Sequence, residues 1–256
     1  MQGHIASFSS PIKWLRQGLS AIRQAPFGMV SICIFYVFTM SVLGALPMFG
    51  LVVAAFFMPF GTMLIIEGTR EAYEGRQPSY GVLVELFKDP FKRSRLMRVG
   101  VIYAAFLLVA NYLYIFMAVD EVSQWQVVDG RLNWDSVYAN FPWSAAVVTV
   151  IIYALGQMAT WFAPALVTWK NMAVGKAIFY SFFGCLRNWL AIVVLLILIF
   201  GFTVLCALAV IFITESLGIG DLSIFVLMPI AFFLTTVAYG TIWPMWVDIF
   251  GDVNAD

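Results

Sequence analysis

The longest apolar stretches of this 256-residue sequence contain no Asp, Glu, Lys, Arg or His. There are six such stretches, at residues 27–46, 49–66, 99–118, 143–167, 190–213 and 223–247. Each is long enough to cross a bilayer as a helix, which takes about 20 residues. A charge at the bilayer centre costs about 2.5–3.5 kcal/mol on insertion scales, so the absence of charge predicts six membrane spans.

Charge is scarce in the whole chain as well, with 11% charged against 62% hydrophobic residues. A soluble domain carries about 25% charged residues, so this composition excludes an ordinary soluble protein. The formal net charge is zero, which gives no bulk attraction to nucleic acid. We therefore expect membrane lipids and other membrane protein subunits as partners, and no nucleic acid.

The residues that carry most enzymatic and metal chemistry are also nearly missing. His4 is the single histidine, and no C-x-x-C spacing occurs among Cys33, Cys185 and Cys206. We therefore expect no metal site, no cofactor, free thiols and no enzymatic activity. A catalytic carboxylate is conceivable at Glu67 or Asp248, each just after a span, although acidic residues at helix ends are usually only solvated.

The basic residues fall on one side of the predicted spans, with one exception. The outer loop 119–142 holds Arg131 alone, and the loop 214–222 holds no base. Because short cytoplasmic loops are enriched in Lys and Arg, this asymmetry predicts that both termini are cytoplasmic. The first span is longer than a signal-peptide core and turns back after Pro47, so we expect no cleavage there.

The order of segments predicts a single all-α membrane domain over residues 1–256, with six transmembrane helices in three hairpins. A cytoplasmic amphipathic segment precedes each outgoing span, at 8–24, 79–95 and 171–188. In the first, apolar residues such as Ile12, Leu15 and Leu19 recur at helical spacing. Such helices lie in the headgroup plane, so we expect three interfacial segments.

Each returning span contains a proline, at Pro59, Pro164 and Pro244. Proline removes a backbone hydrogen-bond donor, so the pattern predicts three kinks. Proline is also common in membrane helices, so three prolines at these places can occur without an internal sequence repeat. Gln157 and Thr160 lie one turn before Pro164 and are the best candidates for lining a cavity. Plain packing between helices is the alternative for both.

The densest charge on the chain is a basic cluster of Lys88, Lys92, Arg93, Arg95 and Arg98. Each such base near a membrane contributes about 1 kcal/mol of attraction to anionic lipid, which predicts a headgroup site. The alternative is that these residues only enforce the topology, and both interpretations fit the sequence.

The most distinctive segment of the sequence lies between residues 161 and 189. It contains Trp161-Phe162-Ala163-Pro164, then Lys176-Ala177, Ser181-Phe182 and Arg187-Asn188-Trp189. This resembles a family of uncharacterised proteobacterial inner-membrane proteins with a Phe-Ala-Pro, Lys-Ala, Ser-Phe and Arg-Asn-Trp signature. The resemblance implies a multi-span protein of the bacterial inner membrane and no particular activity. Asn188 precedes the fifth span, where we expect it to cap the helix.

These observations favour a non-catalytic inner-membrane protein, an accessory or scaffold subunit that interacts with membrane partners or lipids. The alternative is a carrier or channel for an apolar or lipidic substrate, because kinked hairpins around a cavity often mark transport paths.

Overall fold

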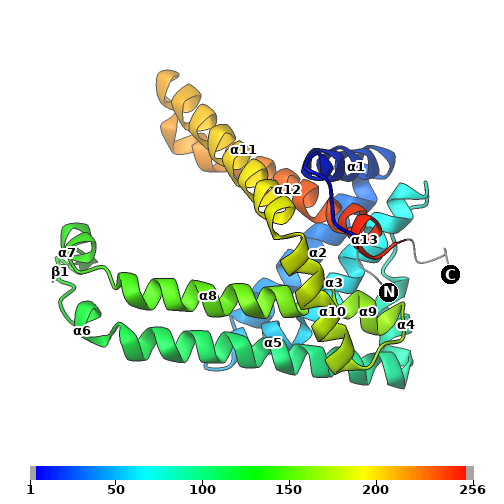
Figure 1. Ribbon diagram of the computed structural model, residues 1–256. Helices are drawn as coiled ribbons and strands as arrows, with labels where there is room; N and C mark the ends of the chain where they lie inside the picture. The colour runs from blue at the N-terminus through cyan, green and yellow to red at the C-terminus, as the bar shows by residue number, and fades with distance from the viewer. Residues whose placement is uncertain (1–3, 252–256) are drawn as a thin grey trace.

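The computed structural model describes residues 4–251, which form three helical hairpins that diverge from a common base (Figure 1). The hairpins pair α2 (Pro26–Gly44) with α3 (Gly50–Tyr73), α5 (Pro90–Met117) with α8 (Trp143–Thr160), and α11 (Trp189–Ser216) with α12 (Ser223–Gly240). Six segments have the length and apolar composition of membrane spans, and the fourth and sixth of these continue past α8 and α12, to Thr168 and Phe250. The predicted all-α architecture of six spans in three hairpins is confirmed.

Five shorter helices build the base, which is the end of the molecule where α1 and α13 lie (Figure 1). They are α1 (Ser10–Gln24), α4 (Gly81–Lys88), α9 (Ala163–Thr168), α10 (Val174–Arg187) and α13 (Ile242–Phe250). The main hydrophobic core lies here, and its fully buried residues include Trp14, Phe162 and Trp246. The base therefore holds the hairpins together.

The helices α1, α4 and α10 each precede an outgoing helix, as the amphipathic segments predict. The expected segment 79–95 is not one element, however, because α4 ends at Lys88. Asp89 then caps α5 by accepting hydrogen bonds from the amides of Phe91 at 2.9 Å and Lys92 at 3.1 Å. Pro90 cannot continue α4 but fits the first turn of a new helix, so residues 90–95 belong to α5.

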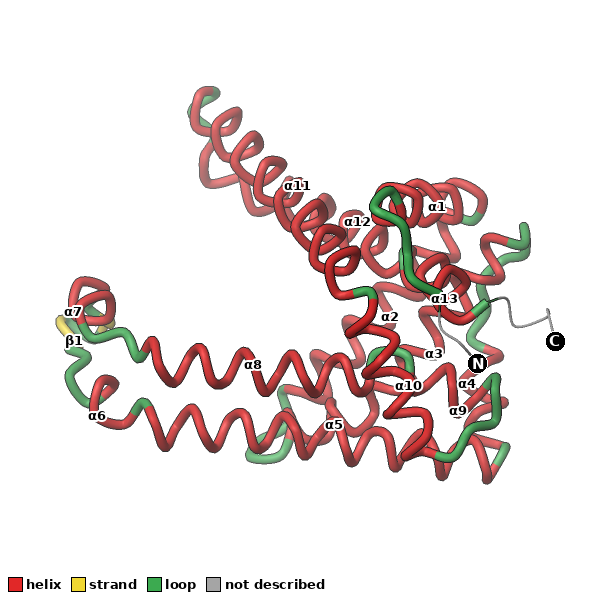
Figure 2. The backbone as a smooth tube through the Cα atoms, viewed as in Figure 1, coloured by secondary structure: helices red, strands yellow, loops and turns green. Residues whose placement is uncertain are grey.

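The connections at the far ends of the hairpins are short or compact (Figure 2). Met48 adopts a left-handed φ of 64° in the turn between α2 and α3. The longest connection contains α6 (Val119–Val122), β1 (Val127–Val128), β2 (Arg131–Leu132) and α7 (Trp134–Ala139), and η1 (Gly220–Leu222) precedes α12. Asp129 and Gly130 join the strands with φ of 52° and 73°, as a two-residue hairpin of primed type requires.

Two of the three predicted kinks are helix breaks instead. Pro59 lies inside the continuous helix α3, whereas Pro164 and Pro244 lie in the first turns of α9 and α13. A helix begins readily at proline, because the first amides have no partner within the helix and proline has no N–H to leave unpaired. The returning chain therefore divides into an outer helix and a short base helix in the second and third hairpins.

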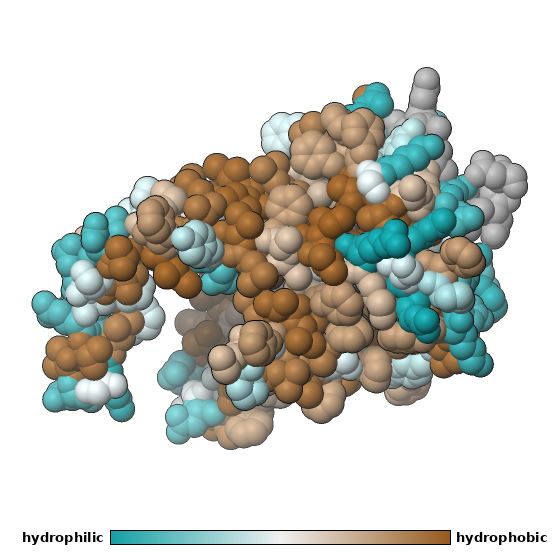
Figure 3. Space-filling model, turned by 90° about the horizontal axis from the view of Figure 1, so that it is seen from below, coloured by the Kyte–Doolittle hydropathy of each residue, from teal (hydrophilic) through white to brown (hydrophobic). Residues whose placement is uncertain are grey.

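Hydrophobic residues cover the middle of the molecule, and hydrophilic residues gather towards the base and the far loops (Figure 3). The hairpin α11–α12 presents the most apolar surface, and Phe200, Phe212 and Phe225 are each 72–73% exposed. Exposed side chains of this kind are stable in hydrocarbon, not in water. The hairpins α5–α8 and α11–α12 diverge away from the base, so lipid-facing surface reaches the sides on which these two hairpins face each other (Figure 1). The hairpin α2–α3 instead packs against α5, where Ala55 and Tyr103 are buried together.

Candidate ligand pocket

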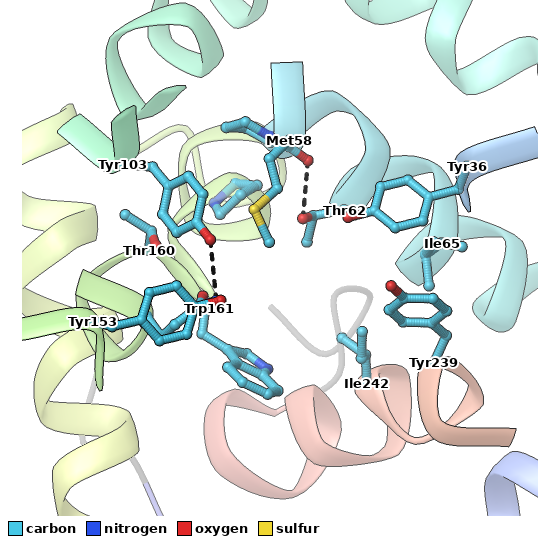
Figure 4. Close-up of a pocket in the computed structure, with 13 residues that line it drawn as sticks. Tyr36, Met58, Thr62, Ile65, Tyr103, Tyr153, Thr160, Trp161, Tyr239 and Ile242 are labelled. Atoms are coloured by element: carbon cyan, nitrogen blue, oxygen red, sulfur yellow. Dashed lines mark hydrogen bonds between the residues drawn. The ribbon is translucent and has the colours of Figure 1, made fainter. Parts of the chain in front are cut away.

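A cavity of about 290 Å³ lies where the three hairpins begin to diverge. Four tyrosines from four different helices line it, namely Tyr36 of α2, Tyr103 of α5, Tyr153 of α8 and Tyr239 of α12. Their phenol groups surround the space from opposite sides (Figure 4). We call this cavity the tyrosine pocket. No charged side chain is among the residues that line it.

Gln157 organises one side of the tyrosine pocket. Its Nε2 donates hydrogen bonds to the hydroxyl oxygens of Tyr103 at 3.1 Å and Tyr153 at 2.6 Å. Both phenols therefore act as acceptors towards the amide. Tyr103 and Tyr153 also hydrogen-bond to each other, so one of their two hydroxyl protons remains available to another acceptor. The arrangement offers a hydrogen-bond donor to a group that enters the pocket.

Close packing fixes the opposite side of the pocket. Tyr36 lies directly on Gly61 of α3, where a Cβ atom would overlap its ring carbons. The rings of Tyr36 and Tyr239 meet edge to face with centroids 5.3 Å apart. Thr62 and Thr160 donate their hydroxyl protons to the backbone carbonyl four residues before, at 3.1 and 2.8 Å, which leaves their oxygens as acceptors.

The break between α8 and α9 brings Trp161 to the pocket wall. Ser181 of α10 stabilises the break, because its Oγ donates to the carbonyl of Met158 at 2.8 Å and accepts from the amide of Phe162 at 3.0 Å. The indole Nε1 of Trp161 is buried and has no hydrogen-bond partner among the described residues. A buried donor of this kind is costly unless a ligand or water satisfies it.

A second cavity of about 340 Å³ lies between α8 and α11. Tyr153, Gln157 and Trp161 line both cavities, so these three side chains form the boundary between them. On the α11 side, the second cavity is lined by residues that include Trp189 and Leu196, which are 57% and 47% exposed. The tyrosine pocket therefore adjoins the lipid-facing wedge between two hairpins.

The structure brings together most of the residues predicted to line a cavity. Gln157, Thr160, Pro59 and Pro164 all line the tyrosine pocket. Pro244 does not, because α13 turns away from the pocket and buries this proline in the base. The four tyrosines were not among the residues predicted to line a cavity. Tyr36, Tyr103, Tyr153 and Tyr239 interrupt apolar spans with hydroxyl groups, and that signal is present in the sequence.

The basic cluster lies at the base, across the end of α4 and the first turns of α5. Three members are already engaged: Lys92 lies 3.9 Å from Asp89, Arg93 donates to the Phe87 carbonyl at 2.8 Å, and Arg95 bonds the side chain of Asn171. Among the described residues, Lys88 and Arg98 have no hydrogen-bond or ion-pair partner. The cluster is therefore only partly available to an external anion.

Asn188 occupies the residue before α11, but its side chain caps no amide of that helix. Its Oδ1 accepts from the amide of Ala6 at 2.7 Å, and its Nδ2 donates to the carbonyls of Gly184 at 2.8 Å and His4 at 3.2 Å. The predicted capping role is wrong, because φ −113° and ψ 14° differ from the extended backbone that a capping side chain needs. Asn188 instead attaches the N-terminal segment to the base.

The two carboxylates considered for catalysis have structural partners. Asp248 accepts hydrogen bonds from Ser10 Oγ at 2.8 Å and Trp14 Nε1 at 3.1 Å, and Lys13 Nζ lies 3.5 Å away. It thus ties α1 to α13.

Glu67 forms an ion pair with Arg70 at 3.3 Å. The Arg70 guanidinium also lies over the rings of Trp169 and Trp243, at 5.9 and 5.6 Å from their centroids. This cluster closes the base beneath the pocket with stacked aromatic and charged groups. Within residues 4–251, no three His, Cys, Asp or Glu side chains are close enough to hold a metal ion together.

Comparison with known proteins adds one relationship. The chain is 24% identical over 244 residues to a probable inner membrane protein of Burkholderia thailandensis, covering 93% of this chain and 90% of that one. No family model matches the chain, and no solved structure matches it. The similarity and the six apolar helices together support a multi-pass protein of the bacterial inner membrane.

Proposed function

We propose that this protein is a non-catalytic inner-membrane protein that binds an uncharged amphipathic molecule in the tyrosine pocket. The observation that carries this proposal is a hydrogen-bonding cavity without charge that adjoins a lipid-facing wedge. Its polar groups are phenols, an amide, threonine hydroxyls and the unpartnered indole of Trp161. These groups recognise neutral oxygen atoms such as hydroxyls and carbonyls.

The absence of charged side chains from this pocket disfavours the binding of ionised headgroups. An ionised group taken out of water needs a counter-charge, and no charged residue lines the tyrosine pocket. A neutral headgroup needs hydrogen bonds only, which Gln157 and the phenols supply. The apolar tail would then leave between α8 and α11, where hydrocarbon already covers the helices.

Native mass spectrometry of the protein extracted in mild detergent tests this proposal. We expect a neutral lipid to stay bound to the wild type and to be lost from Tyr103→Phe/Gln157→Leu. Tyr112→Phe is the matched control, because Tyr112 lies on the same helix, is 67% exposed and is not among the pocket residues. The same neutral lipid bound to all three proteins, or charged phospholipid alone in the wild type, would refute the proposal.

A carrier role extends the same proposal and adds one requirement, namely that the bound lipid exchanges between membranes or leaflets. The divergent hairpins favour it, because a ligand at their point of divergence reaches hydrocarbon without crossing a packed core (Figure 1). Transfer of a fluorescent neutral lipid between vesicles measures this exchange. Transfer that Tyr103→Phe/Gln157→Leu leaves unchanged would contradict a carrier function through this pocket.

A second candidate is the accessory or scaffold role, in which α11–α12 docks another membrane subunit. The observation that favours it is the exposed apolar surface of this hairpin, which contacts the other helices mainly near the base (Figure 1). Extraction in mild detergent followed by size analysis distinguishes the two. A fixed stoichiometric partner supports the accessory role, and a solitary monodisperse species contradicts it.

We further propose that the base faces the cytoplasm and that the basic cluster attracts anionic lipid there. The charge asymmetry of the loops supports the orientation. Neutralising Arg93, Arg95 and Arg98 tests the second part, with binding to anionic liposomes as the measurement. Unchanged binding would mean that these bases only enforce the topology.

A further inference from the structure

A separate groove of about 630 Å³ runs between α1 and the hairpin α11–α12. All residues that line it are apolar except two arginines, Arg16 and Arg23 of α1. The apolar walls come from all three helices and include Leu19, Leu198 and Leu234. The groove shares no lining residue with the tyrosine pocket.

The two arginines lie on one face of α1, seven residues and thus two helical turns apart, about 10 Å along the axis. Both are exposed, and neither has a hydrogen-bond or ion-pair partner among the described residues. Lys13 of the same helix differs, because it pairs with Asp248 at 3.5 Å. The edge of the groove therefore carries two positive charges that the described protein does not neutralise.

The position of α1 beside the hairpin is fixed by contacts at two points. Asp248 accepts hydrogen bonds from Ser10 and Trp14, and the backbone of Gly18 packs against that of Gly240 at the end of α12. The groove is therefore a built feature of the fold. It extends from a charged edge on α1 along the membrane-spanning helices α11 and α12.

We propose that this groove binds an anionic phospholipid. Arginine is suited to phosphate because its guanidinium donates paired hydrogen bonds and stays charged. The headgroup phosphate binds between Arg16 and Arg23, and an acyl chain lies against the apolar walls near Phe202 and Phe233. The site requires both a headgroup phosphate and an acyl chain. This double requirement distinguishes it from a general attraction of the base to anionic surfaces.

Titration of the detergent-purified protein with palmitoyl-oleoyl phosphatidylglycerol or the matching phosphatidylcholine, read by native mass spectrometry, tests the inference. We expect one phosphatidylglycerol to bind in preference to phosphatidylcholine. Arg16→Gln/Arg23→Gln should lower its affinity by roughly tenfold or more, because two phosphate-binding charges are lost. Arg76→Gln/Lys176→Gln removes the same charge from exposed positions that do not line the groove and should retain the lipid.

A steric variant tests the acyl-chain part independently. Leu234→Trp places a larger side chain in the groove while both arginines remain, and we expect weaker binding of phosphatidylglycerol. Equal binding of the two lipids by the wild type overturns the inference, and so does full binding by Arg16→Gln/Arg23→Gln. Tyr103→Phe/Gln157→Leu should retain this lipid, so failure of the groove and failure of the tyrosine pocket are distinguishable.

Discussion

The crossing of α1 over the end of α12 makes a sharp prediction about stability. A Cβ atom on Gly18 would lie 2.8 Å from Gly240 C, 2.9 Å from Gly240 O and 3.1 Å from Thr241 N. Carbon atoms in favourable contact are about 3.5–4.0 Å apart, so Gly18→Ala requires one helix to move by about 0.7 Å or more. Both neighbours are backbone, and Asp248 holds α1 in place, so no flexible side chain can relieve the overlap.

Overpacking of this kind costs about 1–3 kcal/mol, against a gain of about 0.5–1 kcal/mol from replacing a helical glycine by alanine. Gly201→Ala in α11 is the matched control, because no atom lies within 4 Å of a Cβ there. We expect Gly201→Ala to leave the free energy of unfolding unchanged or to raise it. The free energy of unfolding of Gly18→Ala should be lower than that of Gly201→Ala by about 1–3 kcal/mol. Unfolding by SDS titration in one detergent, followed by tryptophan fluorescence, measures the difference. Equal stability of the two variants would refute the reasoning.

Three further predictions concern the base. Ser181→Ala should destabilise the protein by about 1–3 kcal/mol in the same assay, because the buried amide of Phe162 loses its partner; an unchanged midpoint would contradict this. Burial raises the pKa of Cys185 to about 12, and its side chain is 3% exposed. This thiol should therefore resist maleimide at pH 7–8 until the protein is unfolded, and rapid labelling of the folded protein would show that α10 opens. A reporter fused to the C-terminal end should be active in the cytoplasm, and activity only in the periplasm would reverse the proposed orientation.

The sequence predicts the helices well because one physical constraint decides them. Hydrocarbon satisfies no backbone polar group, so an uncharged apolar stretch of about 20 residues becomes a helix regardless of its neighbours. The turn at Pro47 follows from local chemistry in the same way, and Pro90 is a local signal for the end of α4 that the predicted segment 79–95 runs past. The β-hairpin at Asp129-Gly130 also has a local signal in the sequence, an Asp-Gly pair between short apolar runs.

Side-chain partners depend on contacts between distant segments and were predicted less well. Asn188 has the residue type and position of a cap, but its partners Ala6 and His4 are more than 180 residues away. The sequence does not show that the N-terminal segment returns to this point. The cavity residues Gln157 and Thr160 were found because a proline marked their helix, whereas the tyrosines come from four helices whose meeting point is a tertiary feature.

The helix breaks and the pocket have a common physical origin. A continuous returning helix would carry its side chains straight through the base, whereas the break after Thr160 lets Trp161 turn into the wall between the two cavities. Ser181 satisfies the backbone groups that the break releases, so the bend costs little inside the membrane. The hairpins α5–α8 and α11–α12 then diverge above an aromatic base, and in a bilayer hydrocarbon would fill the space between these two hairpins (Figure 1). The proposed ligand of the tyrosine pocket would therefore enter through lipid, which restricts the proposal to molecules that dissolve there.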